Sequence, residues 1–394
     1  MNKQQEPRLR FKGFTGKWKN KTLGDLGRVE MCRRIFKEQT QPSGEIPFFK
    51  IGTFGQEPDA FISSELFEEY RQKYPYPKQG DILISAAGTI GRTVEFTGEN
   101  AYFQDSNIVW LRFDESQITS TFLNITYQNI KWDLEGSTIK RLYNSDLLSA
   151  EITIPSLPEQ THLGLFFRRL DSQIAESRAV LEKSRQLKKA MLAKMFPANG
   201  EKIPKIRFKG FEGEWEEKNF ESVGEFNPKT EIPSIFQYVD LESVVGTQLI
   251  SYREESKETA PSRAQRLAKN GDLFFQAVRP YQKNNYLFEK NNENFVFSTG
   301  YIQIRPQNDG YFLLTLVQKE EFVQEVLLRC TGTSYPAINA SSLQDIAILT
   351  PQTSKEQIAI GNFFRQLDET IALQSAEIEK LNQLKKGLLA AMLV

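Results

Sequence analysis

The stretch "PRLRFKGFTGKW", residues 7–18, recurs almost unchanged as "PKIRFKGFEGEW", residues 204–215. The two copies begin 197 positions apart in a chain of 394 residues, so the repeated unit is half of the chain. Solenoid repeats have periods of roughly 20–50 residues, and a period this long indicates the duplication of a whole domain. A chain of this length can also bury more than one hydrophobic core.

The same spacing relates two further pairs of segments. "EQTHLGLFFRRLDSQI" (159–174) matches "EQIAIGNFFRQLDETI" (356–371), and "QLKKAMLAKM" (186–195) matches "QLKKGLLAAM" (383–392). Between the opening motif and these segments, the two halves share only a general pattern. The sequence therefore predicts a shared opening segment, a variable domain and a shared helix, and it contains this plan twice.

The variable domains have the pattern of a mixed α+β fold. Short apolar runs bounded by Gly, Asn, Asp and Pro predict strands, among them "DILIS", "NIVWLRF", "YIQIRP" and "DIAIL". The runs "TSTFLNITYQNI" and "YFLLTLVQKEEFVQEVL" predict short helices. We predict a first domain, a helix with its linker, a second domain and a second helix, with the bounds 1–155, 156–203, 204–351 and 352–394.

Two long helices are predicted over residues 157–196 and 353–393. Their apolar residues recur in steps of three, four and seven, which is typical of a coiled-coil seam. A helix of roughly 38 residues is about 57 Å long at ~1.5 Å per residue. We expect the two helices to pack on each other. A globular domain lies between them in the chain and favours an antiparallel pair, although a parallel pair stays open at this point.

Composition and charge exclude several classes of protein. The chain is 39% hydrophobic and 25% charged, as in an ordinary globular protein, and its net charge is zero. Bulk charge therefore does not indicate a nucleic-acid partner. The two cysteines, Cys32 and Cys330, form no CxxC pair, which fits a reducing cytosol and predicts a cytoplasmic location. No apolar run reaches the ~18 residues of a membrane span, so no membrane partner is expected.

No convincing catalytic signature occurs in the sequence. The single histidine, His162, has Ala359 as its counterpart in the second half, and we interpret it as a surface residue. No spacing typical of metal ligands, no phosphate-binding loop and no glycine-rich S-adenosylmethionine loop occurs. We therefore predict no catalytic residue and no metal site in this chain.

Several loops combine Arg or Lys with Asn, Gln, Ser, Thr and Tyr, the side chains that contact phosphates and base edges in DNA. The candidate nucleic-acid-binding residues are Arg33, Arg34, Lys37, Thr89, Arg92, Thr138, Lys140, Arg141, Tyr143, Arg279, Gln282, Lys283, Asn284, Ser334 and Tyr335. For any one of them, a solvated loop is an equally good interpretation. The indication of binding comes from similar residue types at corresponding places in both halves.

The aromatic residues of the opening motif have two possible roles. Phe11, Phe14 and Trp18 could pack in a core, or they could contact a ligand directly. We favour packing. Gly13 and Gly16 would permit the turn between the aromatic positions.

With these segments assembled, the chain resembles the specificity subunit of Type I restriction–modification systems over its whole length. The resemblance rests on "RFKGFxGxW" at the start of each half and on "GSTIKRLYNSDLLSAEITIPSLPEQ" (136–160), which leads into the first helix. It also rests on "FFRRLDSQI" followed by "LKKAML", and on the second-half counterpart "GTSYPAINASSLQDIAILTPQTSKEQ" (332–357).

The resemblance implies two target-recognition domains separated by two antiparallel helices. Such proteins bind one DNA sequence made of two half-sites with a fixed gap, and unlike halves imply an asymmetric, bipartite target. They dock two methylation subunits, which methylate adenine at N6 using S-adenosylmethionine, and usually two ATP-driven restriction subunits. The chain itself would bind no cofactor, because S-adenosylmethionine, ATP and Mg are expected on the partner subunits.

The shared helices are the expected docking surface for the methylation subunits, and they are expected to set the gap between the half-sites. The candidate docking residues are Phe166, Phe167, Leu170, Ile174, Phe363, Phe364, Leu367 and Ile371. Two other functions stay open. One is a protein-binding scaffold with two unlike domains. The other is a fused DNA methyltransferase, which the missing cofactor motifs disfavour.

Overall fold

The computed structural model describes residues 6–132, 141–198, 200–291, 294–332 and 334–394. The chain divides into two compact units. The first unit comprises Met1–Arg178 and Glu377–Val394, and the second comprises Ala179–Ala376. Each unit therefore combines one variable domain with a part of each long helix.

Each unit is built around a four-stranded antiparallel sheet with the same arrangement of strands. In the first unit, the order is β2 (Gly27–Glu30), β8 (Ile108–Phe113), β5 (Ile82–Ser85) and β6 (Thr93–Glu95). In the second unit, the order is β11 (Gly224–Phe226), β20 (Tyr301–Pro306), β17 (Leu273–Gln276) and β18 (Tyr286–Leu287). The strands β5 and β17 are buried at every position, which explains their continuous apolar sequence.

Short helices accompany each sheet. The first unit has α2 (Ser120–Asn129), and the side chain of Thr119 caps its first turn. The second unit has α5 (Gly310–Val317), capped by Asp309, and α6 (Glu320–Leu328). Both predicted helical runs are confirmed, and the second run forms two helices because the backbone of Lys319 is extended between them.

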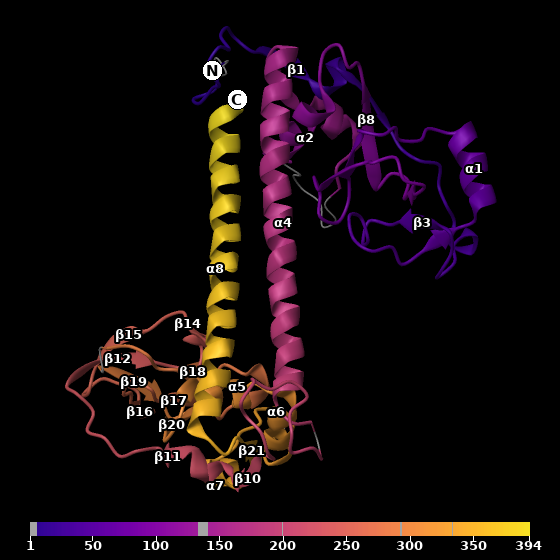
Figure 1. Cartoon of the computed structure of the whole chain (residues 1–394). Coiled ribbons are helices and arrows are strands. Elements are labelled where there is room, and N and C mark those ends of the chain that lie inside the picture. The colour runs from indigo at the N-terminus through magenta and orange to yellow at the C-terminus, as the bar shows by residue number, and fades with distance from the viewer. Residues whose placement is uncertain (1–5, 133–140, 199, 292–293, 333) are drawn as a thin grey trace. The chain divides into compact units, whose positions relative to one another are not determined.

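A second sheet in each unit contains one parallel strand pair. In the first unit, its order is β4 (Phe61–Ile62), β3 (Ile46–Phe49) and β7 (Tyr102–Phe103), beside helix α1 (Ser64–Lys73). In the second unit, its order is β15 (Arg253–Ser256), β12 (Ile235–Val239), β19 (Phe295–Ser298) and β16 (Ala264–Leu267) (Figure 1). The second unit also has a small hairpin, β13 (Val244–Val245) with β14 (Gln248–Leu249).

The segments shared by the two halves form a two-stranded frame in each unit. In the first unit, β1 (Lys19–Thr22) pairs with β9 (Glu151–Ile154), and α3 (Asn144–Ser149) precedes β9. In the second unit, β10 (Glu216–Asn219) pairs with β21 (Ala347–Thr350), and α7 (Ala340–Gln344) precedes β21. Single turns of 3₁₀ helix occur at Leu23–Asp25 (η1), Lys37–Gln39 (η2), Phe220–Val223 (η3) and Pro280–Gln282 (η4).

The two long helices are confirmed as α4 (Leu157–Met195) and α8 (Ser354–Met392), each of 39 residues (Figure 1). Their contacts show an antiparallel pairing in each unit. In the first unit, Asp171 pairs with Lys385, and Arg178 lies next to Asn382. In the second unit, Lys188 pairs with Asp368, while the later residues of α4 cluster with the first turns of α8. Residues later in α4 therefore contact residues earlier in α8. This order excludes the parallel alternative.

The antiparallel helices contribute to both main hydrophobic cores. In the first unit, Leu163 and Phe167 of α4 share a core with Leu389 of α8. In the second unit, the ring of Phe196, directly after α4, lies 6.3 Å from that of Phe364 in α8. Among the described residues, no helix combines the length and the apolar character that crossing a membrane requires.

The packing role predicted for the motif aromatics is confirmed. Trp18 and its counterpart Trp215 are buried in the two main cores. The ring of Phe11 lies edge-on to Phe166 of α4, with the ring centres 5.5 Å apart. Phe14 packs against the ring of the exposed His162. The opening motif therefore attaches each variable domain to the start of a long helix.

Candidate nucleic-acid interface

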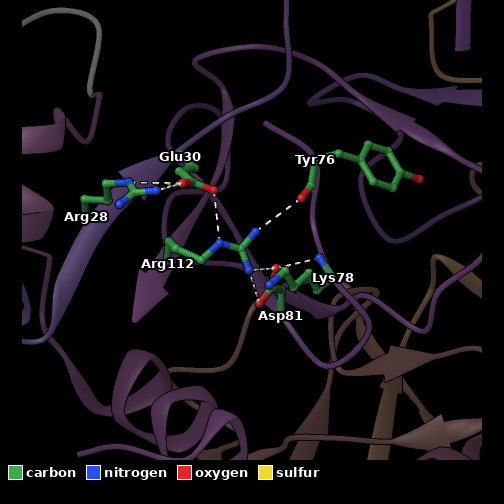
Figure 2. Close-up of polar contacts among 6 residues, drawn as sticks. All are labelled: Arg28, Glu30, Tyr76, Lys78, Asp81 and Arg112. Atoms are coloured by element: carbon green, nitrogen blue, oxygen red, sulfur yellow. Dashed lines mark hydrogen bonds and ion pairs between the residues drawn. The ribbon is translucent and has the colours of Figure 1, made fainter. Parts of the chain in front are cut away.

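A partly buried ion-pair network fixes the start of strand β5 in the first unit. Figure 2 shows Arg112 of β8 between the carboxylates of Glu30 and Asp81. Its Nε lies 3.1 Å from Glu30 Oε2, its Nη1 lies 3.0 Å from Asp81 Oδ2, and its Nη2 donates to the carbonyl oxygen of Tyr76 at 3.2 Å. The backbone N–H of Lys78 donates to Asp81 Oδ2 at 2.7 Å. These contacts hold the turn before β5 against the neighbouring strand β8.

Burial is the main influence on the carboxyl group of Asp81. The pKa of Asp81 is raised because its carboxyl group is removed from water, although the hydrogen bond from Lys78 and the charge of Arg112 act in the opposite direction. At the outer side, the exposed Arg28 also binds Glu30, with Nη2 2.8 Å from Oε1 (Figure 2). Glu30 is therefore shared between two guanidinium groups.

The second unit repeats the arginine–aspartate pair at the equivalent strand positions. Arg305 of β20 binds Asp272 through Nε at 2.9 Å and Nη2 at 3.1 Å. The backbone N–H of Lys269 and the side-chain amide of Gln303 also donate to Asp272, at 2.8 and 2.7 Å. Asp272 is fully buried, so the pair ties the turn before β17 to β20.

At the other end of β5, a buried polar side chain braces the loop that follows. Ser85 is the last residue of β5, and its Oγ accepts the backbone N–H of Arg92 at 2.9 Å and donates to the carbonyl of Thr89 at 2.5 Å. The backbones of Ser85 and Arg92 are also paired, with N–H to O at 2.9 Å. The turn between β5 and β6 is thereby closed on the strand end.

Gln276, the last residue of β17, likewise holds the loop that follows its strand. Its Nε2 donates to Gln282 Oε1 at 2.9 Å, and its Oε1 accepts the backbone N–H of Asn284 at 3.1 Å. Its own backbone N–H donates to Asn285 Oδ1 at 2.8 Å. Ser85 and Gln276 are both almost fully buried. Two chemically different residues therefore perform the same bracing role at the same place in the two sheets.

In each unit, a second predicted loop lies beside the braced loop. The backbone N–H of Leu142 donates to the carbonyl of Ala86 at 2.8 Å in the first unit. In the second unit, Ile338 donates to Ala277 at 3.0 Å, and Arg279 donates to Pro336 at 2.7 Å. The structure thus brings together the loops that the sequence indicated separately.

Two stretches of the chain, residues 15–183 and 212–383, match the family model of the Type I restriction modification DNA specificity domain. The stretches fall on the two copies of the internal repeat and together cover most of the chain. The chain belongs to this family. It therefore contains two specificity domains, one for each half of the sequence.

Two curated specificity subunits are similar to parts of the chain. A putative type I restriction enzyme specificity subunit of Haemophilus influenzae is 63% identical over 139 residues, which are 35% of this chain and 36% of that protein. The Type I restriction enzyme HindI specificity subunit of the same organism is 23% identical over 164 residues, 40% of this chain and 35% of that protein. The chain spans about a third of the length of the curated relatives it matches.

A solved structure extends the likeness to the whole fold. The crystal structure of the Type-I restriction-modification S subunit from M. genitalium aligns with a TM-score of 0.66 over 99% of each chain, at 16% sequence identity. The two-domain α+β fold with long helices is therefore that of an S subunit.

In the first specificity domain, two of the predicted arginines donate to backbone carbonyls. Arg92 Nη2 donates to Gly55 O at 3.2 Å, and Arg141 Nη2 donates to Ser106 O at 3.0 Å. Thr89 lies in the braced turn, and Tyr143 is an exposed residue at the start of α3. The predicted residues Thr138 and Lys140 lie outside the described residues.

The remaining candidates of the first domain lie elsewhere. The guanidinium of Arg33 stacks over Tyr74 at 5.3 Å, that of Arg34 over Phe36 at 5.6 Å, and Lys37 begins η2. Within the described part of the chain, no hydrogen bond, ion pair or cation–π contact joins these three side chains to the loop after β5.

In the second domain, most candidates lie in or beside the braced loop. Arg279 stacks over the ring of Tyr335, with Cζ 4.6 Å from the ring centre. Lys283 is paired with Glu320, Nζ to Oε2 at 2.7 Å, and also donates to a backbone carbonyl. Asn284 Oδ1 accepts the N–H of Gly246 at 2.8 Å. Gln282 is held by Gln276, as described above, and Ser334 is exposed next to Tyr335.

The predicted docking residues lie in the first half of each long helix. The structure places Phe167, Leu170, Ile174 and Phe364 in the cores of the chain itself, and Phe166, Phe363, Leu367 and Ile371 are half-buried. A docked partner would therefore have to contact exposed residues beside the buried ones. The docking role of these positions stays a prediction.

The sequence interpretation missed the residues that hold the loops. Asp81 with Arg112, Asp272 with Arg305, and the braces at β5 and β17 were not singled out. One signal was present, since a Gly-Asp pair precedes the central apolar strand in both halves, in "GDILIS" and "GDLFFQ". No group of His, Cys, Asp and Glu among the described residues is arranged to hold a metal ion.

Proposed function

We propose that this chain recognises a DNA sequence as the specificity subunit of a Type I restriction–modification complex. In this proposal, each specificity domain reads one half of an asymmetric, bipartite target. The supporting observation is the common scaffold, in which an arginine–aspartate pair fixes one end of the central strand and a buried brace fixes the loop at the other. The scaffold is the same in both domains and the loop side chains differ.

The chemistry of the loops supports base recognition. Arg and Gln side chains can make paired hydrogen bonds to the edges of guanine and adenine in the major groove. The second domain presents Arg279 and Gln282 from one loop, whereas the first presents Thr89 and Arg92. Unlike side chains on a common scaffold should select unlike half-sites.

The proposal assigns catalysis to the partners. Two methylation subunits would use S-adenosylmethionine to methylate adenine, and restriction subunits would use ATP and Mg. Exposed leucines at equivalent positions of the helices, Leu187 of α4 and Leu384 of α8, are suitable contacts for two copies of one partner. Exposed apolar side chains at corresponding places favour two equivalent docking sites.

The long helices are proposed to set the gap between the half-sites. Each helix has 39 residues. Adding seven residues lengthens a helix by about 10 Å at ~1.5 Å per residue. That length corresponds to about three base pairs, at ~3.4 Å each. Inserting one heptad into both helices should therefore lengthen the gap without changing either half-site.

Methylation mapping tests the proposal. The chain would be produced with the methylation subunit encoded in the same genome, and methylated adenines would be mapped by long-read sequencing. One bipartite motif is expected, and replacing residues 20–150 by those of a relative should change one half-site only. A methylated motif that is a continuous palindrome, or no new methylation, would contradict the proposal and would favour the scaffold function. A change in both half-sites would contradict the assignment of one domain to one half-site.

A further inference from the structure

We infer that Arg279 recognises a guanine in the half-site of the second domain, by donating from its guanidinium fork to the base edge in the major groove. The inference rests on the proposed DNA-binding function and makes it specific. It predicts that this half-site contains a G·C base pair and that Arg279 recognises it.

The backbone places Arg279 at a fixed point. Its N–H donates to Pro336 O at 2.7 Å, and the neighbouring residues Val278 and Ala337 form a bridge. Its φ of 55° lies in the left-handed region, which is unfavourable for a residue with a side chain. Such backbone strain persists where the surrounding structure enforces it, and it is concentrated at functional sites.

The side chain is also held, but it is not neutralised. Its Cζ lies 4.6 Å from the ring centre of Tyr335, which is 63% exposed. Among the described residues, no carboxylate lies within ion-pair distance of Arg279, whereas Arg253 and Arg305 in the same unit are each paired with aspartate. The guanidinium of Arg279 therefore lies over an aromatic ring and has no carboxylate to occupy its hydrogen-bond donors.

An unpaired guanidinium held over an aromatic ring is suited to a base edge. Guanine presents two acceptors, O6 and N7, whose spacing matches the arginine fork. A contact with phosphate needs the charge but not the fork geometry, and losing it would weaken binding to every DNA sequence equally. The neighbouring Gln282 is oriented by the amide of Gln276, so the loop presents two fixed polar groups together.

Variants of Arg279 test the inference in the complex with the methylation subunit. Mapped methylation should show a G·C position in the second half-site that becomes degenerate in Arg279→Ala, with a loss of discrimination of about 10- to 100-fold at that position. Arg279→Lys keeps the charge but loses the fork, so it should also relax the position. Arg263→Ala removes an exposed arginine of the same unit and should leave the motif unchanged.

The first half-site acts as an internal control for folding. If Arg279→Ala abolishes methylation altogether, the wild-type complex is tested on DNA in which each guanine of the second half-site is replaced in turn by 7-deazaguanine, which lacks the N7 acceptor. Weaker binding by the wild type, with no such weakening in the variant, supports the inference. An unchanged motif in Arg279→Ala, or equal weakening on all sequences, overturns it and leaves the proposed function standing. A wild-type complex without any bipartite motif overturns both.

Discussion

Arg10 forms a two-pronged ion pair with Glu159, with Nε to Oε1 at 2.7 Å and Nη2 to Oε2 at 2.8 Å. Arg207 repeats this pair with Glu356 at the same two distances. Both glutamates are almost fully buried in the first turn of a long helix. Arg10 also donates to the carbonyl of Gly16, so one side chain joins the opening motif to itself and to α4. The repeated motif is thus an anchor between the variable domain and the helix.

Removing this anchor should destabilise the first unit. Arg10→Ala leaves the buried carboxylate of Glu159 without its partner, and breaking such a pair typically costs about 3 kcal/mol. Hydrogen exchange in the first turns of α4 should rise accordingly. Lys73→Ala, which removes an exposed ion pair with Glu69, is the matched control and should leave stability nearly unchanged, because solvent screens exposed pairs. Equal effects of the two variants would contradict the anchoring role.

The two cysteines should react at very different rates. Burial raises the pKa of the Cys32 thiol to about 12, and Cys330 is only half-buried. Since the thiolate is the reactive form, at pH 8 a thiol with that pKa is only about 0.01% ionised. Labelling with a disulfide reagent at pH 8 should modify Cys330 first, and Cys32 only when the first unit opens. Labelling of both thiols at one rate in the Cys330→Ala and Cys32→Ala single variants would refute this.

Reversing the two charges of an ion pair between α4 and α8 should preserve most of the stability that the pair provides. Asp171 and Lys385 form an ion pair in the first unit, and their equivalents in the repeat, Asp368 and Lys188, form one in the second. Asp171→Lys places like charges together and should cost about 1 kcal/mol, in line with partly exposed pairs. The double variant Asp171→Lys with Lys385→Asp should regain most of this loss in a double-mutant cycle of unfolding free energies. No recovery in the double variant would show that the charges do not interact.

Loosening a brace should affect one half-site at a time. Gln276→Ala removes the donor to Gln282 and the acceptor for Asn284, so the loop of the second domain loses its fixed shape. Recognition of the second half-site should weaken by about tenfold, the equivalent of one or two hydrogen bonds, while the first half-site is unchanged. Methylation mapping measures both. Gln265→Ala, an exposed glutamine of the same unit, is the control.

The corresponding change in the first domain is Ser85→Ala. It should relax the first half-site and leave the second intact, because the hydroxyl braces only the turn between Thr89 and Arg92. If either variant altered both half-sites, or neither, the braces would not be the residues that position the reading loops.

Much of the fold follows from local sequence. The helices α4 and α8 were predicted to within one residue at each end, since a sustained apolar period of three to four residues is a strong local signal. The strands β5, β8, β20 and β21 were predicted from short apolar runs. The repeat offset and the motif aromatics also indicated which segments are equivalent and which side chains pack.

The sequence by itself thus determined the duplication, the long helices and the central strands. Each is encoded either in neighbouring residues or in residues that are identical between the two halves. Only the tertiary structure decided the loop supports. Ser85 and Gln276 are 191 positions apart rather than 197, and they share no chemistry beyond polarity, so the repeat could not reveal them as equivalent. Their roles depend on partners brought close by sheet pairing, which local periodicity does not encode. The same holds for Arg10 and Glu159, whose pairing closes a loop of nearly the whole first domain.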